Sequence, residues 1–97
     1  MQKLKDDEIQ NYLEQVEGWT VDDGILKKDF GIKGFRTALE FMNMLAPIAE
    51  KLDHHPDWSN SYNRVVINLT THGARGLTKN DFKFAKEADR IAKLLRS

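Results

Sequence analysis

Residues 64–70 carry apolar side chains at every second position, because Val65, Ile67 and Leu69 alternate with residues of mixed polarity. Successive side chains of a β-strand point to opposite faces, so this segment predicts a strand with one apolar face and one mixed face. Such strands are typical of an antiparallel sheet that is covered on one side. The rest of the chain therefore has to supply the cover for that face.

Three segments with helical periodicity are expected to provide this cover. Apolar residues recur at spacings of three and four at about residues 6–17, 34–51 and 79–95. In the first segment, Asp6 or Asp7 is expected to cap the helix and Gly18 to end it. In the second, Pro47 removes a backbone donor, so we expect one helix with a bend.

The remaining helix ends also carry signals. Thr78 and Asp81 precede the last apolar stripe as N-cap and N3 residues, which is a capping box with Asp in place of Glu. Pro56 disfavours helical geometry at His55, so the long helix is expected to end at or just before the paired residues His54 and His55.

The strands are expected to form two pairs. Asp23 followed by Gly24 is a strong hairpin signal and predicts strands at about 18–22 and 25–32. A long strand is expected at 62–70, after a short strand or lead-in at 58–61. The element order α-β-β-α-β-β-α predicts an α+β fold, with a two-layer arrangement of a four-stranded antiparallel sheet and three helices packed on one face. The length of 97 residues predicts a single domain, 1–97.

The length of the 62–70 strand bears on assembly. An exposed strand edge of this size invites pairing with a second subunit, so we expect a homodimer. A tetramer would require the long helices to pack across dimers, and Phe41, Met44 and Ile48 are the apolar positions expected to do so.

Composition excludes several classes of function. The chain has no cysteine, which removes disulfides, thiolate metal sites and a cysteine nucleophile. Fifteen basic and fifteen acidic residues give a formal net charge of zero, so we expect no direct binding of nucleic acid. The N-terminal segment has no apolar run of the signal-peptide type, and no segment approaches the roughly 20 apolar residues that span a bilayer. We expect a soluble, cytoplasmic protein.

Three histidines are the candidate functional residues: His54 and His55 lie in "LDHHPDW", and His72 lies in "LTTHGARGLT". Neighbouring residues on a regular element point in different directions, which disfavours a metal shared by the pair. A histidine at a helix C-terminus also interacts favourably with the helix dipole, which is a purely structural role. Since an unperturbed imidazole pKa of about 6.5 suits proton transfer at neutral pH, metal-free acid–base catalysis is the third interpretation. The inventory favours proton transfer and leaves the other two open.

A wider pattern surrounds these histidines. Residues 49–81 contain E-K-x-x-H-H-P-x-W, then Y-N-x-V, then T-H-x-x-x-G-L-T-x-x-D, without a break. This pattern resembles that of the pterin-4a-carbinolamine dehydratase family, also called 4a-hydroxytetrahydropterin dehydratases. The matching positions are Glu50, Lys51, His54, His55, Pro56, Trp58, Tyr62, Asn63, Val65, Thr71, His72, Gly76, Leu77, Thr78 and Asp81.

The resemblance implies a reaction. It is the dehydration of 4a-hydroxytetrahydropterin to quinonoid dihydropterin, which recycles the pterin cofactor of aromatic amino acid hydroxylases. That reaction needs an acid for the departing hydroxyl and a base for the N5 proton, with no metal and no bound cofactor. By the same resemblance, His54 and His72 are expected to transfer the protons, and His55 to bind and orient the pterin.

The resemblance also implies supporting residues. Asp81 is expected to orient a histidine or to hydrogen-bond the pterin ring, and Glu50 to serve as a supporting or substrate-binding carboxylate. Trp58 is a candidate for the pocket wall, with core packing as its alternative. Some members of this family act as dimerisation cofactors for a homeodomain transcription factor, so a protein-binding module is the alternative function.

Overall fold

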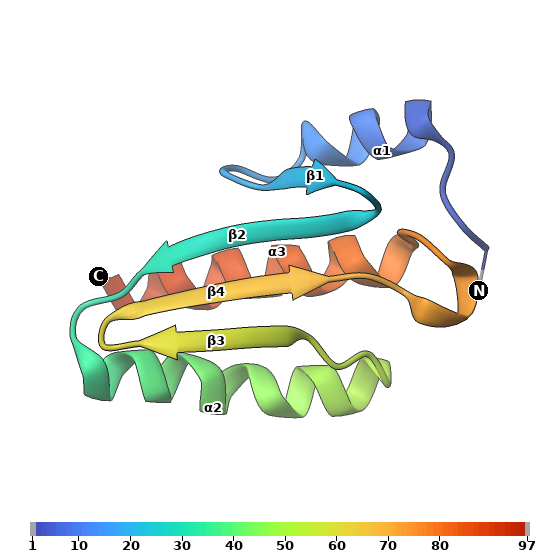
Figure 1. The fold of residues 1–97 in the computed structure, drawn as a ribbon. Coiled ribbons are helices and arrows are strands. Elements are labelled where there is room, and N and C mark those ends of the chain that lie inside the picture. The colour runs from blue at the N-terminus through green and yellow to red at the C-terminus, as the bar shows by residue number, and fades with distance from the viewer. Residues whose placement is uncertain (1, 97) are drawn as a thin grey trace.

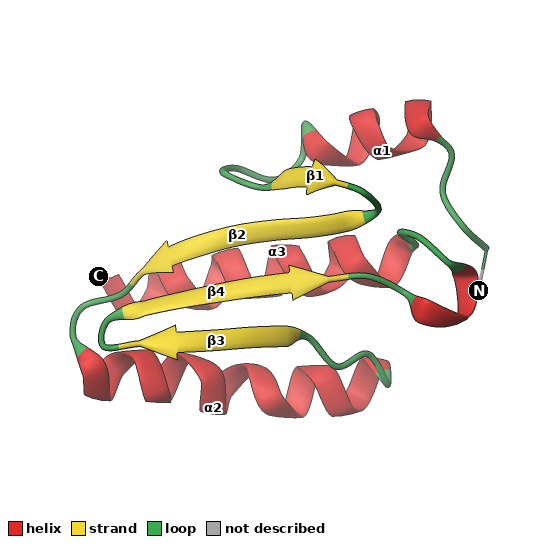
Figure 2. Cartoon of the chain, in the orientation of Figure 1, coloured by secondary structure: helices red, strands yellow, loops and turns green. Residues whose placement is uncertain are grey.

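Four strands form one antiparallel sheet in the order β1-β2-β4-β3 (Figure 1). In this computed structural model, which describes residues 2–96, the strands are β1 Thr20–Asp22, β2 Ile25–Gly31, β3 Asp57–Ser61 and β4 Arg64–Leu69. The α-helices are α1 Asp6–Leu13, α2 Phe35–Leu52 and α3 Lys79–Arg96, and a 3₁₀ turn, η1, spans His72–Ala74. The predicted order α-β-β-α-β-β-α and the α+β class are confirmed (Figure 2).

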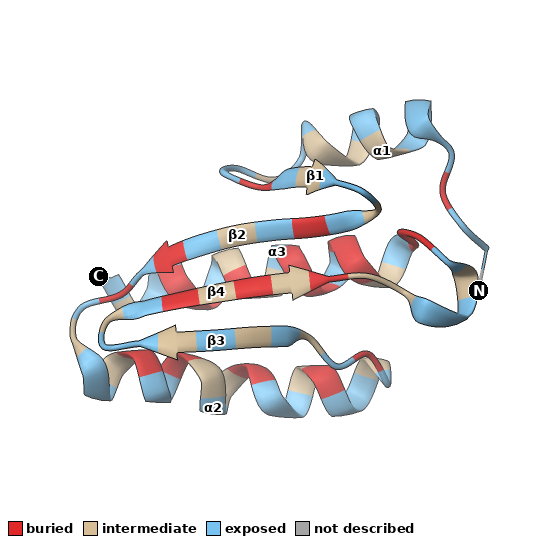
Figure 3. Ribbon diagram, in the orientation of Figure 1, coloured by how far each residue is buried: buried red, intermediate tan, exposed pale blue. Residues whose placement is uncertain are grey.

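The helices lie against one face of the sheet (Figure 1). The period-two pattern of β4 is the reason, because Val65, Ile67 and Leu69 are all 0–1% exposed and meet the helices (Figure 3). Fully burying one such side chain is worth about 1.5–3 kcal/mol, so β4 contributes strongly to the core. Within residues 2–96, no helix has both the length and the apolarity to cross a membrane.

β4 lies inside the sheet, which corrects the expectation of an exposed edge on a 62–70 strand. It pairs with β2 on one side and with β3 on the other. The expected strand was two residues too long at its start, because Tyr62, with φ of 54°, and Asn63 form the turn between β3 and β4. The free edges belong to β1 and β3. The other hairpin turn follows its sequence signal, with positive φ at both Asp23 and Gly24.

The first helix is shorter than predicted and has a different cap. It ends at Leu13 rather than near residue 17, because the next backbone bonds run from Gln15 to Tyr12 and from Val16 to Leu13, as in a tighter turn. Lys5 occupies the N-cap, where its backbone N–H donates to Glu8. Asp6 and Asp7, the predicted caps, lie within the first turn and favour it through the helix dipole.

The long helix α2 runs unbroken through Pro47, whose side chain is exposed. The lost donor therefore falls on the solvent side of the helix, where water can satisfy the carbonyl that it leaves free. Phe41 is fully buried within its own chain, so the expectation that it packs across a tetramer is wrong. The exposed large apolar residues of this helix are Phe35 and Leu39.

The end of α2 depends on Asp53, which adopts left-handed backbone geometry with φ of 48°. The backbone N–H of Asp53 donates to the carbonyl of Glu50, and that of His54 donates to the carbonyl of Ala49 at 2.9 Å. These two bonds form a Schellman motif. The helix ends just before the paired histidines, as predicted, and the Schellman turn closes it three residues ahead of Pro56.

This turn generates a test of stability. Asp53→Gly is expected to keep or raise stability, since glycine adopts positive φ without steric cost. Asp53→Val is expected to lower the free energy of unfolding by about 1–2 kcal/mol. Urea unfolding followed by circular dichroism measures both. Equal stability of the valine and glycine variants would contradict a left-handed Asp53.

Candidate active site

Three segments that carry the candidate residues meet at one end of the molecule. The C-terminal end of α2, the chain after β4 with η1, and the start of α3 all lie at the right-hand end in Figure 1. The end of α2, the end of β4 and the start of α3 therefore converge there (Figure 1). Two histidine–carboxylate contacts lie there, and they differ in burial.

The first contact joins His54 to Asp81. The Nε2 atom of His54 lies 2.5 Å from Oδ1 of Asp81, and the two residues are 8% and 0% exposed. The Schellman turn places His54 next to the first turn of α3, where Asp81 is the N3 residue. A buried carboxylate that holds one ring nitrogen of an imidazole fixes the orientation of the ring.

The second oxygen of Asp81 is also fully engaged. Oδ2 accepts a hydrogen bond from the backbone N–H of Thr78 at 2.8 Å and one from the hydroxyl of Thr71 at 2.9 Å. The Thr71 and Thr78 hydroxyls lie 2.9 Å apart. Half of the predicted capping box is therefore present, since the N3 carboxylate caps the Thr78 amide while the Thr78 hydroxyl meets Thr71.

The second contact joins His55 to Glu50 on the surface. Nε2 of His55 lies 2.7 Å from Oε1 of Glu50, and the two side chains are 59% and 75% exposed. Glu50 belongs to the last turn of α2, so the helix end supplies the carboxylate and the following loop supplies the imidazole. This pair is open to solvent and accessible to a ligand.

His72 begins η1 and is exposed. Its loop is closed by an antiparallel bridge between Thr71 and Gly76, in which each backbone N–H donates to the carbonyl of the other residue. Thr71, which anchors this loop, also donates to Asp81. His72 is thus linked to the His54–Asp81 pair through its neighbour in the chain.

Trp58 lies on β3 opposite Ile67, on the face of the sheet that meets the helices. It is partly buried and packs against the core. This position favours core packing, and a contact with substrate stays a prediction.

The histidine and carboxylate side chains of the described residues do not form a metal site. Among residues 2–96, no three histidine, aspartate or glutamate side chains are grouped closely enough to hold a metal ion. The two carboxylates near histidines each pair with a single imidazole.

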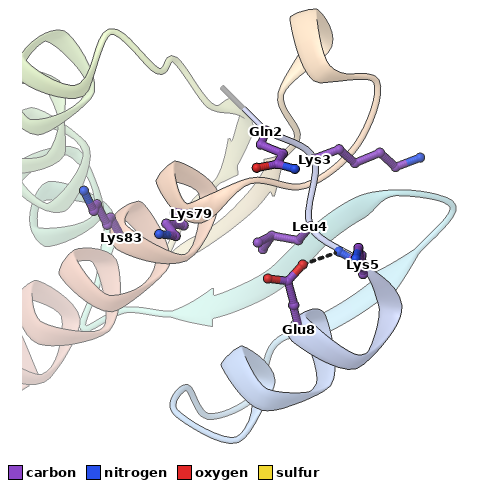
Figure 4. Close-up of a pocket in the computed structure, with 7 residues that line it drawn as sticks. All are labelled: Gln2, Lys3, Leu4, Lys5, Glu8, Lys79 and Lys83. Atoms are coloured by element: carbon purple, nitrogen blue, oxygen red, sulfur yellow. Dashed lines mark hydrogen bonds between the residues drawn. The ribbon is translucent and has the colours of Figure 1, made fainter.

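A separate hollow of about 440 Å³ lies between the N-terminal segment, the start of α1 and the start of α3 (Figure 4). Its polar lining includes four lysines and Glu8, and the carboxylate of Glu8 accepts the Lys5 amide. No histidine lines this hollow, so the candidate catalytic groups lie elsewhere in the molecule.

Sequence reasoning did not assign a site role to Thr71. The available signal was its position directly before His72. Thr78 was assigned to the helix cap alone, and its hydroxyl contact with Thr71 depends on the tertiary structure.

The fold and these contacts define an α+β domain with two histidine–carboxylate pairs at one end. The model of the family described as pterin 4 alpha carbinolamine dehydratase matches residues 2–91. The chain belongs to the pterin-4a-carbinolamine dehydratase family.

Individual relatives of this chain carry the name of the same family. Proteins named as pterin-4-alpha-carbinolamine dehydratase from Prochlorococcus marinus and Sulfolobus acidocaldarius are 41% and 44% identical to this chain. The alignments cover 91% and 92% of this chain and 93% and 98% of the relatives. The crystal structure of a transcriptional coactivator/pterin dehydratase from Brucella melitensis aligns with a TM-score of 0.90 and 41% identity, over 93% of this chain and 98% of that one.

The contrast in burial between the two contacts generates a test. Asp81→Ala is expected to lower the free energy of unfolding by about 2–4 kcal/mol, because it leaves buried donors without a partner. Glu50→Ala, the matched control, removes an exposed partner and is expected to cost at most about 1 kcal/mol. Urea unfolding measures the free energy of unfolding of both variants. An equal decrease in the two would contradict the assignment of Asp81 as the buried carboxylate that holds these donors.

Proposed function

We propose that this protein dehydrates 4a-hydroxytetrahydropterin to quinonoid dihydropterin by histidine acid–base catalysis, in the recycling of a tetrahydropterin cofactor. Family membership supports the enzyme class, a hydro-lyase that acts on a pterin. The observation that carries the mechanism is the pair of histidine–carboxylate contacts at one end of the molecule.

In this mechanism His54 and His72 move the protons. One imidazolium protonates the C4a hydroxyl, which leaves as water, and one neutral imidazole takes the N5 proton, so the atoms balance without a metal or redox partner. Asp81 holds Nε2 of His54 and leaves Nδ1 for the exchange. His72 is exposed and can approach a bound ring from the opposite segment.

His55 and Glu50 bind and orient the pterin in this proposal. Their contact at 2.7 Å supports it, because a carboxylate-held imidazole on an exposed surface presents a fixed hydrogen-bonding edge. The tight helix end places His55 on the surface while His54 points into the protein. The neighbouring histidines therefore have different tasks.

His72→Ala is expected to lower turnover by about 10²–10⁴-fold, the usual contribution of a general acid or base. Dehydration of freshly generated 4a-hydroxytetrahydropterin measures it, and an unchanged unfolding midpoint serves as the control for folding. His55→Ala, the matched comparison, is expected to raise KM more than it lowers kcat. Wild-type turnover by folded His72→Ala protein would remove His72 from the mechanism.

We also propose a homodimer that forms through the free edge of β3. The sheet topology supports this edge, since β3 pairs on one side only and is longer than the other edge strand, β1. A tetramer would use the outer side of α2, where Phe35 and Leu39 are 49% and 41% exposed. Exposed apolar side chains one helical turn apart are suited to pack against another helix.

Sedimentation equilibrium tests this assembly. The wild-type protein is expected to be at least dimeric at micromolar concentration. Leu39→Lys is expected to abolish any tetramer and to leave the dimer intact, because it lies on α2 and not on the β3 edge. A monomeric wild-type protein would contradict the dimer, and loss of the dimer in Leu39→Lys would relocate its interface to α2.

A dimerisation cofactor or protein-binding module is the second candidate function. It is supported by the name of the Brucella melitensis protein, which is called a transcriptional coactivator as well as a pterin dehydratase. The exposed apolar side of α2 would be the binding surface. The dehydration assay separates the two candidates, since a rate no higher than the spontaneous one would favour the binding module.

A further inference from the structure

The hydroxyl groups near Asp81 form a directed chain. Each threonine hydroxyl has a single hydrogen, and the Thr71 hydroxyl donates its hydrogen to Oδ2 of Asp81. At its 2.9 Å contact with Thr78, the Thr71 oxygen is therefore the acceptor, and Thr78 is the donor. The chain runs from Thr78 to Thr71 to Asp81, and the other carboxylate oxygen continues it to His54.

Thr78 departs from the usual capping geometry to make this chain. In a complete capping box the N-cap hydroxyl accepts the N3 amide. Here the amide of Asp81 donates to the Thr78 carbonyl at 3.2 Å, and the Thr78 hydroxyl, which is fully buried, is directed to Thr71. A local cap contact is replaced by one that reaches the neighbouring segment.

Thr71 holds the His72 loop through its backbone. Its N–H donates to Gly76 at 3.0 Å, and its carbonyl accepts from Gly76 at 3.4 Å and from Ala74 at 3.1 Å. The next residue in the chain is His72. One residue thus joins the loop of one proposed catalytic histidine to the carboxylate that holds the other.

We propose that Thr71 is a positioning residue, whose hydroxyl aligns the His54–Asp81 pair with the loop that carries His72. The proposal rests on the proposed function, because it assigns catalytic roles to both histidines. Thr71 contacts neither the pterin nor the reacting atoms in this scheme and acts through Asp81. Thr78 supports this role of Thr71, because the Thr78 hydroxyl donates to the Thr71 hydroxyl and fixes the rotation of that hydroxyl.

The primary test is Thr71→Val, which replaces the hydroxyl by a methyl group of similar size. We expect kcat to fall about 10- to 100-fold, the loss typical of small misplacements between reacting groups, with little change in KM. Thr71→Ser, which keeps the hydroxyl, is expected to restore kcat to within about threefold of wild type.

Thr70→Val is the matched control. Thr70 precedes Thr71 and is also partly buried, but its hydroxyl donates to the carbonyl of Gly24, away from Asp81. We expect its kcat to match wild type. A fall in kcat equal to that of Thr71→Val would overturn the proposal, because any lost hydroxyl in this segment would then have the same effect.

A second readout does not depend on catalysis. In ¹⁵N-histidine-labelled protein, the ring nitrogen signals of His54 report its contact with Asp81. Thr71→Val is expected to shift these signals, and Thr71→Ser and Thr70→Val to leave them in place. If the wild-type protein proves inactive, the proposed function fails while this measurement still tests the alignment by Thr71.

Three further outcomes would overturn the proposal. The first is that Thr71→Val leaves both kcat and the His54 signals unchanged. The second is that Thr71→Ser loses as much activity as Thr71→Val. The third is that the unfolded fraction of Thr71→Val alone accounts for its fall in kcat. If Thr71→Val does not fold, Thr78→Val carries the test by removing the donor to Thr71. A threefold or larger fall in its kcat is expected, and an unchanged value counts against the proposal.

Discussion

The contact between His54 and Asp81 is the interaction on which the candidate site depends. A carboxylate with no exposure is costly to bury unless its oxygens accept enough hydrogen bonds. Asp81 meets this requirement with one imidazole, one backbone amide and one hydroxyl, which come from three different segments. The end of α2, the loop after β4 and the start of α3 are thereby held together by a single group, and the candidate residues Glu50, His55 and His72 belong to these same segments.

Two neighbouring histidines acquire different environments because of one backbone conformation. The left-handed Asp53 turns the chain so that His54 returns toward α3 and His55 stays on the surface. Had the helix continued, the two rings would have differed only by a rotation of about 100° around one helix axis. Instead, one imidazole binds a buried carboxylate and the other an exposed one, so the ring proposed to transfer a proton and the ring proposed to bind the ligand lie in different environments.

The two-layer fold could be predicted from the sequence because it depends on local periodicity. The alternation around Val65 and Ile67 identifies the buried face of a strand, but it does not say whether the strand is central or at an edge. For that reason the exposed edge expected from the sequence falls on a strand that the structure places inside the sheet as β4. Likewise, the apolar stripe of α2 is wider than the surface through which this helix contacts the core. Periodicity alone therefore leaves open whether Phe41 or Leu39 is buried, because the rotation of α2 against the sheet determines which of the two faces inward. The left-handed Asp53 has no sequence signal comparable to glycine.

The site shows the same division between local and tertiary information. Thr78 and Asp81 have the spacing of a capping box, and the sequence alone therefore explains both as helix-start residues. The structure keeps the carboxylate half of that box and redirects the hydroxyl to Thr71. A local preference that is set aside in a largely buried network must be offset by what the network holds in place. Here the network holds the carboxylate that contacts His54, so the departure from the local rule points to the candidate site more sharply than the histidine spacing does.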